Sequence, residues 1–149
     1  MSTSTAIMKK LREIAPSIHF EAEYSVDVHA KWDGDGPDPI DEGMNAYYVD
    51  VFARAVVGGK SLTGQSSLGG VYEFPNKHDP DIGGYLPQML EEAVNDLRSI
   101  LALTLVTDER SPNPVNPPSS LFKECEKAQA FLKTTLHARY RQQTRGLYR

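Results

Sequence analysis

Between Ile18 and Trp32 the chain alternates strictly between apolar and polar side chains. Every even position in this segment is apolar, and every odd position is polar or charged. Successive side chains of a strand point to opposite faces of a sheet, so the pattern predicts one long strand with a single buried face.

A second strand is predicted over residues 45–57, where the odd positions from Tyr47 to Val57 are all apolar. The even positions are mixed, because Tyr48, Phe52 and Val56 alternate with charged residues. A half-apolar outer face is typical of a sheet that another element, a subunit or a bound polypeptide covers.

A third strand is predicted to return over residues 60–74. Gly58 and Gly59 lie between the two segments and favour a two-residue hairpin turn. Gly64, Gly69 and Gly70 interrupt the third segment, as expected for β-bulges or for close approaches by another backbone.

Helical spacing of apolar residues precedes and follows these strands. Residues 5–14 predict a short helix, although a first edge strand also fits them. A main helix is predicted to begin near Pro87. Four prolines within 111–118 predict an extended connector, and a last helix is predicted from Ser119 or Ser120.

The end of the main helix is apolar nearly all round over residues 100–106, which indicates burial in a large core or between subunits. A chain of 149 residues has a limited core, so we favour subunits. The expected interface residues are Leu97, Ile100, Leu101 and Leu105.

The length of the chain indicates one domain, and its apolar and charged fractions are those of ordinary soluble proteins. Its single cysteine, Cys125, lies in a helical pattern and is expected to act as a small buried hydrophobe in a reducing cytoplasm. The N-terminus lacks the apolar core of a signal peptide. No apolar run reaches the length of a membrane span, so no membrane insertion is expected.

Charge is distributed unevenly along the chain. Residues 1–110 carry nine more acids than bases, whereas residues 111–149 carry five more bases than acids. Residues 137–149 hold four arginines and no acid. We therefore expect a folded domain over 1–136 and a basic, flexible tail over 137–149.

Several motifs between Ala46 and Phe122 occur in a characteristic order. The sequence Leu68-Gly69-Gly70-Val71-Tyr72 ends the third strand, and Gly84-Tyr85-Leu86-Pro87-Gln88-Met89-Leu90 opens the main helix. Pro114-Val115-Asn116 then precedes Leu121-Phe122 in the last helix. In order and spacing this part of the chain resembles the SecB family of export chaperones.

The resemblance implies an α+β fold, with about four antiparallel strands in one sheet and two C-terminal helices. It also implies a homotetramer, built as a dimer of dimers, that holds unfolded polypeptides without ATP and without a cofactor. The client would be a preprotein for export or, as in SecB-like chaperones beside toxin–antitoxin modules, an aggregation-prone antitoxin. The basic tail replaces the acidic tail of typical export members and favours the antitoxin role.

A chaperone needs apolar surface that remains accessible after folding and is kept soluble by surrounding charge. The second sheet face and the end of the first strand with its loop are the best candidates in this sequence. The expected client-binding residues are Trp32, Ile40, Tyr48, Phe52, Val56, Tyr72 and Phe74.

Other chemistry has weaker support in the sequence. Asp33, Asp35 and Asp38 resemble part of a calcium loop but lack its flanking helices and late glutamate. His78-Asp79 is expected to be an ordinary surface pair, and neither a phosphate-binding loop nor a nucleophile motif is present. We therefore expect a protein that is not an enzyme.

Nucleic-acid binding is the alternative function. The predicted helix–strand–strand–strand–helix order is also that of double-stranded RNA-binding domains. The basic arm, with Tyr140 and Tyr148, is suited to phosphate contacts and base stacking. The acidic body and Glu91-Glu92 near the start of the main helix argue against this function.

Overall fold

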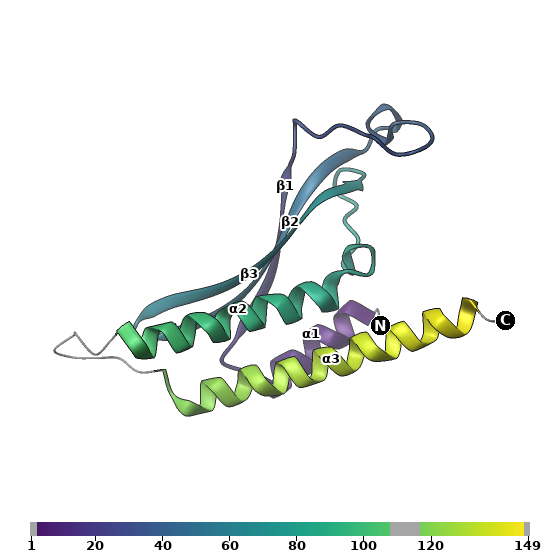
Figure 1. The fold of residues 1–149 in the computed structure, drawn as a ribbon. Helices are drawn as coiled ribbons and strands as arrows, with labels where there is room; N and C mark the ends of the chain where they lie inside the picture. The colour runs from purple at the N-terminus through teal and green to yellow at the C-terminus, as the bar shows by residue number, and fades with distance from the viewer. Residues whose placement is uncertain (1–2, 108–116, 148–149) are drawn as a thin grey trace.

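The computed structural model describes the backbone of residues 3–107 and 117–147, and the side chains of residues 4–103 and 117–136. Three strands form one antiparallel sheet in the order β1-β2-β3, with helices before and after them (Figure 1). The elements in chain order are α1 (Thr3–Ile14), β1 (His19–Val26), the 3-10 turn η1 (Pro39–Glu42), β2 (Asn45–Val57), β3 (Lys60–Glu73), η2 (Ile82–Gly84), α2 (Leu86–Thr107) and α3 (Ser119–Leu147).

The α+β class predicted from the sequence is confirmed, but the sheet has three strands in the described part of the chain instead of about four. The N-terminal segment is the helix α1, because Ile7 and Leu11 are four residues apart and both enter the core. The proline connector predicted over 111–118 lies mostly outside the described residues.

The β2–β3 hairpin has the predicted turn, with φ of 58° at Gly58 and 79° at Gly59. Further along, Tyr48 on β2 faces both Gly69 and Gly70 on β3, so the predicted bulge is confirmed. Gly70 has φ of 70°, a conformation that glycine adopts without steric cost. Beyond this bulge Tyr72 lies opposite Ala46, on the outer face of the sheet.

The core lies between the inner face of the sheet and the helices. The odd residues of β2, from Val49 to Val57, pack with apolar residues of α1, α2 and α3. Cys125 of α3 is fully buried among them, as predicted. Burial raises the pKa of its thiol to about 11, so the sulfur stays protonated near neutral pH.

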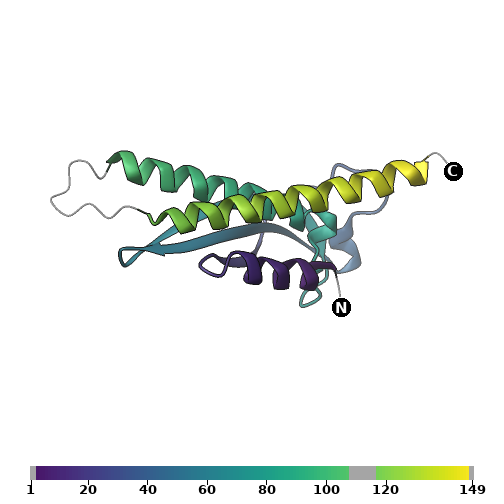
Figure 2. The same ribbon diagram turned by 90° about the horizontal axis from the view of Figure 1, so that it is seen from below.

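Helices α2 and α3 run side by side in both views of the ribbon (Figures 1 and 2). Arg98 of α2 joins them, since its guanidinium donates to the amide oxygen of Gln129 at 3.1 Å and pairs with Glu126 at 3.2 Å. Helix α3 continues through residues 137–147, past the predicted boundary of the tail at residue 136. None of the described helices has the length and apolar character that a membrane span requires.

The first strand is shorter than its alternating pattern predicts, because β1 ends at Val26. Val26 pairs with Tyr47, and the Asp27 amide still donates to the Ala46 carbonyl, but β2 begins only at Asn45. In this register Val28 would lie opposite Asn45, the first residue of β2, and residues 29–32 would lie opposite residues 41–44, which are outside the strand. Val28 is 79% exposed. Alternation marks strand-compatible residues, whereas the length of a strand depends on its partner.

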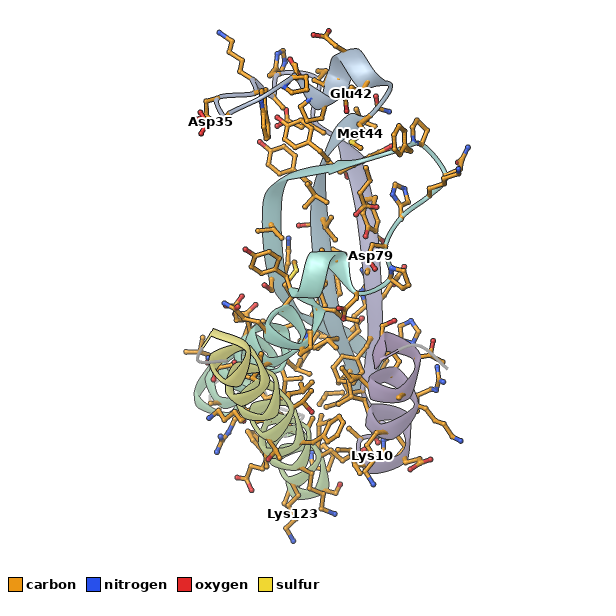
Figure 3. All side chains as sticks on the ribbon, turned by 90° about the vertical axis from the view of Figure 1, so that its right-hand side faces the viewer. Lys10, Asp35, Glu42, Met44, Asp79 and Lys123 are labelled. Carbon is orange, nitrogen blue, oxygen red and sulfur yellow. The ribbon has the colours of Figure 1, made fainter. Side chains whose placement is uncertain are left out.

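The sheet extends beyond the helices at one end, which we call the distal end. The distal end comprises the loop of residues 27–44 and the adjoining ends of the strands. Asp35, Glu42 and Met44 lie at this end, whereas Lys10 and Lys123 lie at the opposite, helical end (Figure 3).

Candidate functional site

The outer face of the sheet lies on the side away from the three helices, and we define it by the even residues of β2 and their neighbours. Tyr48, Phe52 and Val56 all belong to it, as predicted. Tyr48 is 49% exposed, Val56 is 71% exposed and Phe52 is half-buried. A row of apolar side chains therefore remains accessible along the centre of the sheet.

Charged and polar side chains separate these apolar residues. The Arg54 guanidinium lies 4.5 Å from the centre of the Phe52 ring and also pairs with Glu21 of β1. Asp50 accepts hydrogen bonds from the Ser67 hydroxyl and, at 3.0 Å, from the side-chain amide nitrogen of Gln65. The outer face is therefore a mixed surface, with separate apolar sites held between fixed polar groups.

At the distal end, Trp32 of the loop of residues 27–44 contacts the outer face. The Trp32 and Tyr72 rings meet edge to face, with centroids 5.3 Å apart, and Ala46 opposite Tyr72 is buried. The Trp32 indole nitrogen is buried without a hydrogen-bond partner among the described residues. Trp32 and Tyr72 therefore contribute less open surface than the sequence predicts.

Two further predicted residues of this surface lie at the distal end and remain exposed. Ile40 belongs to η1, whose first turn is capped by the Asp38 carboxylate at 2.9 Å from the Ile40 amide. Phe74 follows β3, and its ring lies beside Gly43. The seven predicted client-binding residues thus divide into an open row on β2 and a partly closed distal cluster.

The predicted interface on α2 needs correction. Leu97 and Leu101 are fully buried, and both belong to the core of their own chain. Ile100 is half-buried, the exposed Leu103 is a residue that the prediction omitted, and the side chain of Leu105 lies outside the described residues. The apolar pattern of α2 is therefore explained largely by packing against the sheet and α3.

A second polar cluster, not predicted from the sequence, lies at the distal half of the inner face. The His78 imidazole stacks on the Tyr24 ring at 3.9 Å between centroids, and its Nδ1 lies 3.1 Å from the Glu73 carboxylate. Glu73 also accepts the Asp79 amide at 2.9 Å, and the Tyr24 hydroxyl donates to the Asp79 carbonyl at 3.1 Å. These contacts attach the loop of residues 74–85 to β1 and β3.

The position of this cluster explains why the sequence did not reveal it. Tyr24 and Asp79 are 55 residues apart and meet only because the loop after β3 returns across the sheet. His78 and Asp79 are exposed, as predicted for a surface pair, but His78 also has defined contacts with Tyr24 and Glu73 that the sequence did not reveal. Within the described residues, no group of histidine, cysteine or acidic side chains is arranged to hold a metal ion.

Burial, followed by the nearby Glu73 and Asp79 carboxylates, raises the pKa of Tyr24 from 10.0 to about 12. The unfolded chain then ionises at lower pH than the folded one, so the contribution of Tyr24 to stability is complete below about pH 10 and is lost as the pH rises towards 12. We expect Tyr24→Phe to lack this alkaline loss. Urea denaturation of the wild type and of Tyr24→Phe at pH values from 10.0 to about 12 measures the free energy of unfolding of each protein. An equal loss of stability in both would contradict the raised pKa of Tyr24.

Comparisons with known proteins identify no relatives. No protein-family model, no curated protein and no solved structure matches this chain.

Proposed function

We propose that this protein is an ATP-independent chaperone that holds a non-native polypeptide on the outer face of its sheet. The observation that carries this proposal is the row of Tyr48, Phe52 and Val56, which stays accessible although a complete apolar core exists on the other side of the sheet. Exposed apolar rows on a folded sheet are typical of surfaces that bind other chains.

The spacing of this row fits an extended client. Tyr48, Phe52 and Val56 are separated by four residues along β2, or roughly 13 Å per step. An extended polypeptide can therefore place apolar side chains at the three sites while its polar groups meet Asp50 and Arg54. The acids Glu21 and Glu23 beside the row keep such a surface soluble.

The strand β1 offers a second kind of contact. It is an edge of the sheet, with β2 as its neighbour on one side. An extended client can pair its backbone with such an edge while its side chains contact the outer face. Both contacts depend on backbone geometry and on apolar area, so the proposed clients are unfolded chains, such as a preprotein or an antitoxin.

The test is suppression of aggregation. We expect the protein, without ATP, to lower the light scattering of a denatured and diluted model protein. We expect Phe52→Asp to reduce this protection at least several-fold, because a charge then occupies the centre of the apolar row. Ala130→Asp, which adds the same charge on the exposed side of α3, is the matched control.

The two variants distinguish the possible results. Full protection by Phe52→Asp would contradict the assignment of the outer face. Equal losses in both variants would indicate a general charge effect instead of a binding site. Circular dichroism of each variant confirms that the fold is retained.

The oligomeric state that the resemblance implies, a tetramer, belongs to this proposal. With Leu97 and Leu101 in the core, the exposed surface of α2 around Leu103 is the better candidate for an interface. A reducing cytoplasm suits the single buried cysteine, and we place the proposed function there.

RNA binding is a second candidate, because the observed order α1-β1-β2-β3-α2 is that of double-stranded RNA-binding domains. The acids Glu91 and Glu92 near the start of α2 would repel phosphate, so we rank this function second. A gel-shift assay with double-stranded RNA at low salt separates it from the chaperone. The side chains of the basic arm, residues 137–149, lie outside the described residues.

A further inference from the structure

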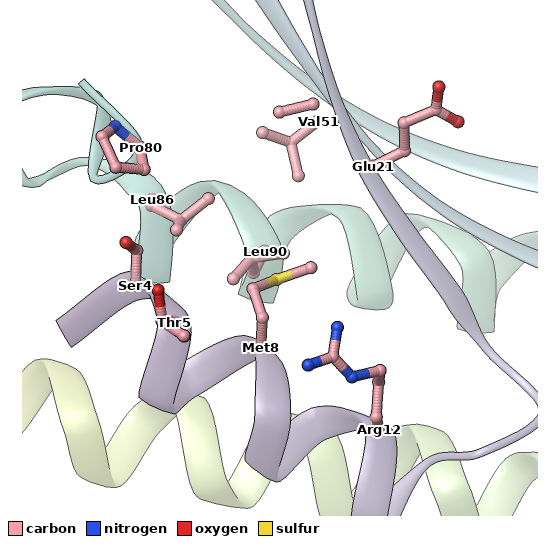
Figure 4. A pocket seen from close by; sticks show the side chains of 10 residues that line it. Ser4, Thr5, Met8, Arg12, Glu21, Val51, Pro80, Leu86 and Leu90 are labelled. Atoms are coloured by element: carbon pink, nitrogen blue, oxygen red, sulfur yellow. The ribbon is translucent and has the colours of Figure 1, made fainter. Parts of the chain in front are cut away.

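A cavity of about 340 Å³, partly open to solvent, lies between α1, the inner face of the sheet and the start of α2 (Figure 4). Its volume falls within the range of small-molecule sites in proteins. It is separate from the outer face, because Ala22 and Val51 of the inner face line it. The remaining lining residues are Ser4, Thr5, Met8, Arg12, Glu21, Pro80, Leu86 and Leu90.

The wall of the cavity is mostly apolar. Leu86 and Leu90 are one turn apart on α2, and Met8 of α1 points towards them (Figure 4). Leu86, Leu90 and Val51 are buried residues of the core, so the site is formed by packed elements. A flexible methionine beside branched aliphatic side chains accepts apolar chains of varied shape.

One cationic group faces this apolar space. Arg12 lies one turn after Met8 on the same side of α1, and Figure 4 shows its guanidinium pointing from the helix towards the cavity. Among the described residues, no carboxylate lies within ion-pair distance of it. Glu21 also lines the cavity, but its carboxylate pairs with Arg54 and points away from the space.

We propose that this cavity binds a small carboxylic acid with an unbranched apolar chain, whose carboxylate pairs with Arg12 and whose chain lies between Met8, Val51, Leu86 and Leu90. The pocket is partly open to solvent, so a chain can extend along it. A medium-chain fatty acid combines the two required features, a carboxylate and an unbranched apolar chain. The proposal does not depend on the chaperone function.

The test is calorimetric titration of the whole chain with octanoate, decanoate and decanol, at concentrations below micelle formation by the two acids and below the solubility limit of decanol. Each buried methylene should tighten binding about fourfold, so decanoate, with two more methylenes, should bind roughly fifteenfold more tightly than octanoate. Arg12→Gln should weaken decanoate binding about tenfold, because a charge-assisted hydrogen bond is lost. It should leave decanol binding unchanged.

Two further variants make the result specific. Lys10→Gln removes the same charge from an exposed position of α1 that does not line the cavity, and it should bind decanoate like the wild type. Ala22→Phe should abolish binding of all three probes, because a phenyl ring then fills the space beside Val51. Circular dichroism confirms folding of each variant.

The proposal is overturned if the wild type does not bind decanoate at millimolar concentration. It is also overturned if Lys10→Gln weakens binding as much as Arg12→Gln, which would indicate general charge attraction. Undiminished binding by Ala22→Phe would place the acid elsewhere, for example on the outer face, and would overturn it as well.

Discussion

Substituting Gly64 by alanine is expected to destabilise the protein severely. A β-carbon at this position would lie 2.1 Å from the carbonyl oxygen of Ala93 and 2.4 Å from the amide nitrogen of Leu97. Both atoms belong to the backbone of α2, so no side-chain rotation can relieve the overlap. We expect a loss of about 3 kcal/mol or more in the free energy of unfolding, at the upper end of overpacking effects.

The contacts around Gly64 show why the close approach matters. The backbone amide of Gln65 donates to the Asp96 carboxylate at 2.9 Å, and the Ser66 hydroxyl donates to the Glu92 carboxylate at 2.7 Å. Helix α2 thereby covers the edge of β3 and supplies acceptors for its polar groups. Moving the helix away to admit a methyl group would weaken these hydrogen bonds as well as the core.

Gly69→Ala is the matched control on the same strand. Its β-carbon would meet the Tyr48 ring at 2.9 Å, and this exposed side chain can move. We expect a loss of roughly 1 kcal/mol or less for this variant. Urea denaturation followed by circular dichroism measures both, and similar losses in the two variants would contradict the close approach of α2.

Substituting Leu101 by aspartate is expected to unfold the protomer. Leu101 is fully buried in the core, so the variant either buries an unpaired carboxylate or opens the structure around it. The combined loss of apolar burial and cost of the charge should exceed about 4 kcal/mol, a large part of the stability of an ordinary domain. Thermal denaturation and proteolysis detect such a loss.

Leu103→Asp introduces the same charge two residues further along α2, at a position that is 62% exposed. We expect its protomer to remain folded. If the exposed side of α2 forms the proposed subunit interface, this variant should lower the mass measured by light scattering. A folded Leu101→Asp variant of unchanged stability would refute the core assignment, and an unchanged mass for Leu103→Asp would exclude this part of α2 as the interface.

The structure around α2 shows what its apolar pattern could not reveal. A helix end that is apolar on several sides predicts burial, and Leu97 and Leu101 are indeed buried. The pattern does not state whether the covering surface comes from the same chain or from another. Here the sheet on one side and α3 on the other supply it within one chain.

For the candidate site the sequence predicted the row of Tyr48, Phe52 and Val56, because alternation places side chains two residues apart on one face. It did not predict that Trp32 would close over Tyr72, because this contact depends on the path of an eighteen-residue loop between β1 and β2. The Tyr24–His78 stack and the cavity beside Arg12 were missed for the same reason.

The sequence by itself determined the α+β class, both ends of β2, the hairpin turn at Gly58-Gly59 and the bulge at Gly69-Gly70. These features follow from local periodicity and from backbone conformations that glycine adopts readily. Only the tertiary structure decided where β1 ends, which apolar residues of α2 remain accessible and which distant side chains form clusters. Each of these depends on surfaces contributed by distant parts of the chain, and local patterns carry no information about which surface meets which.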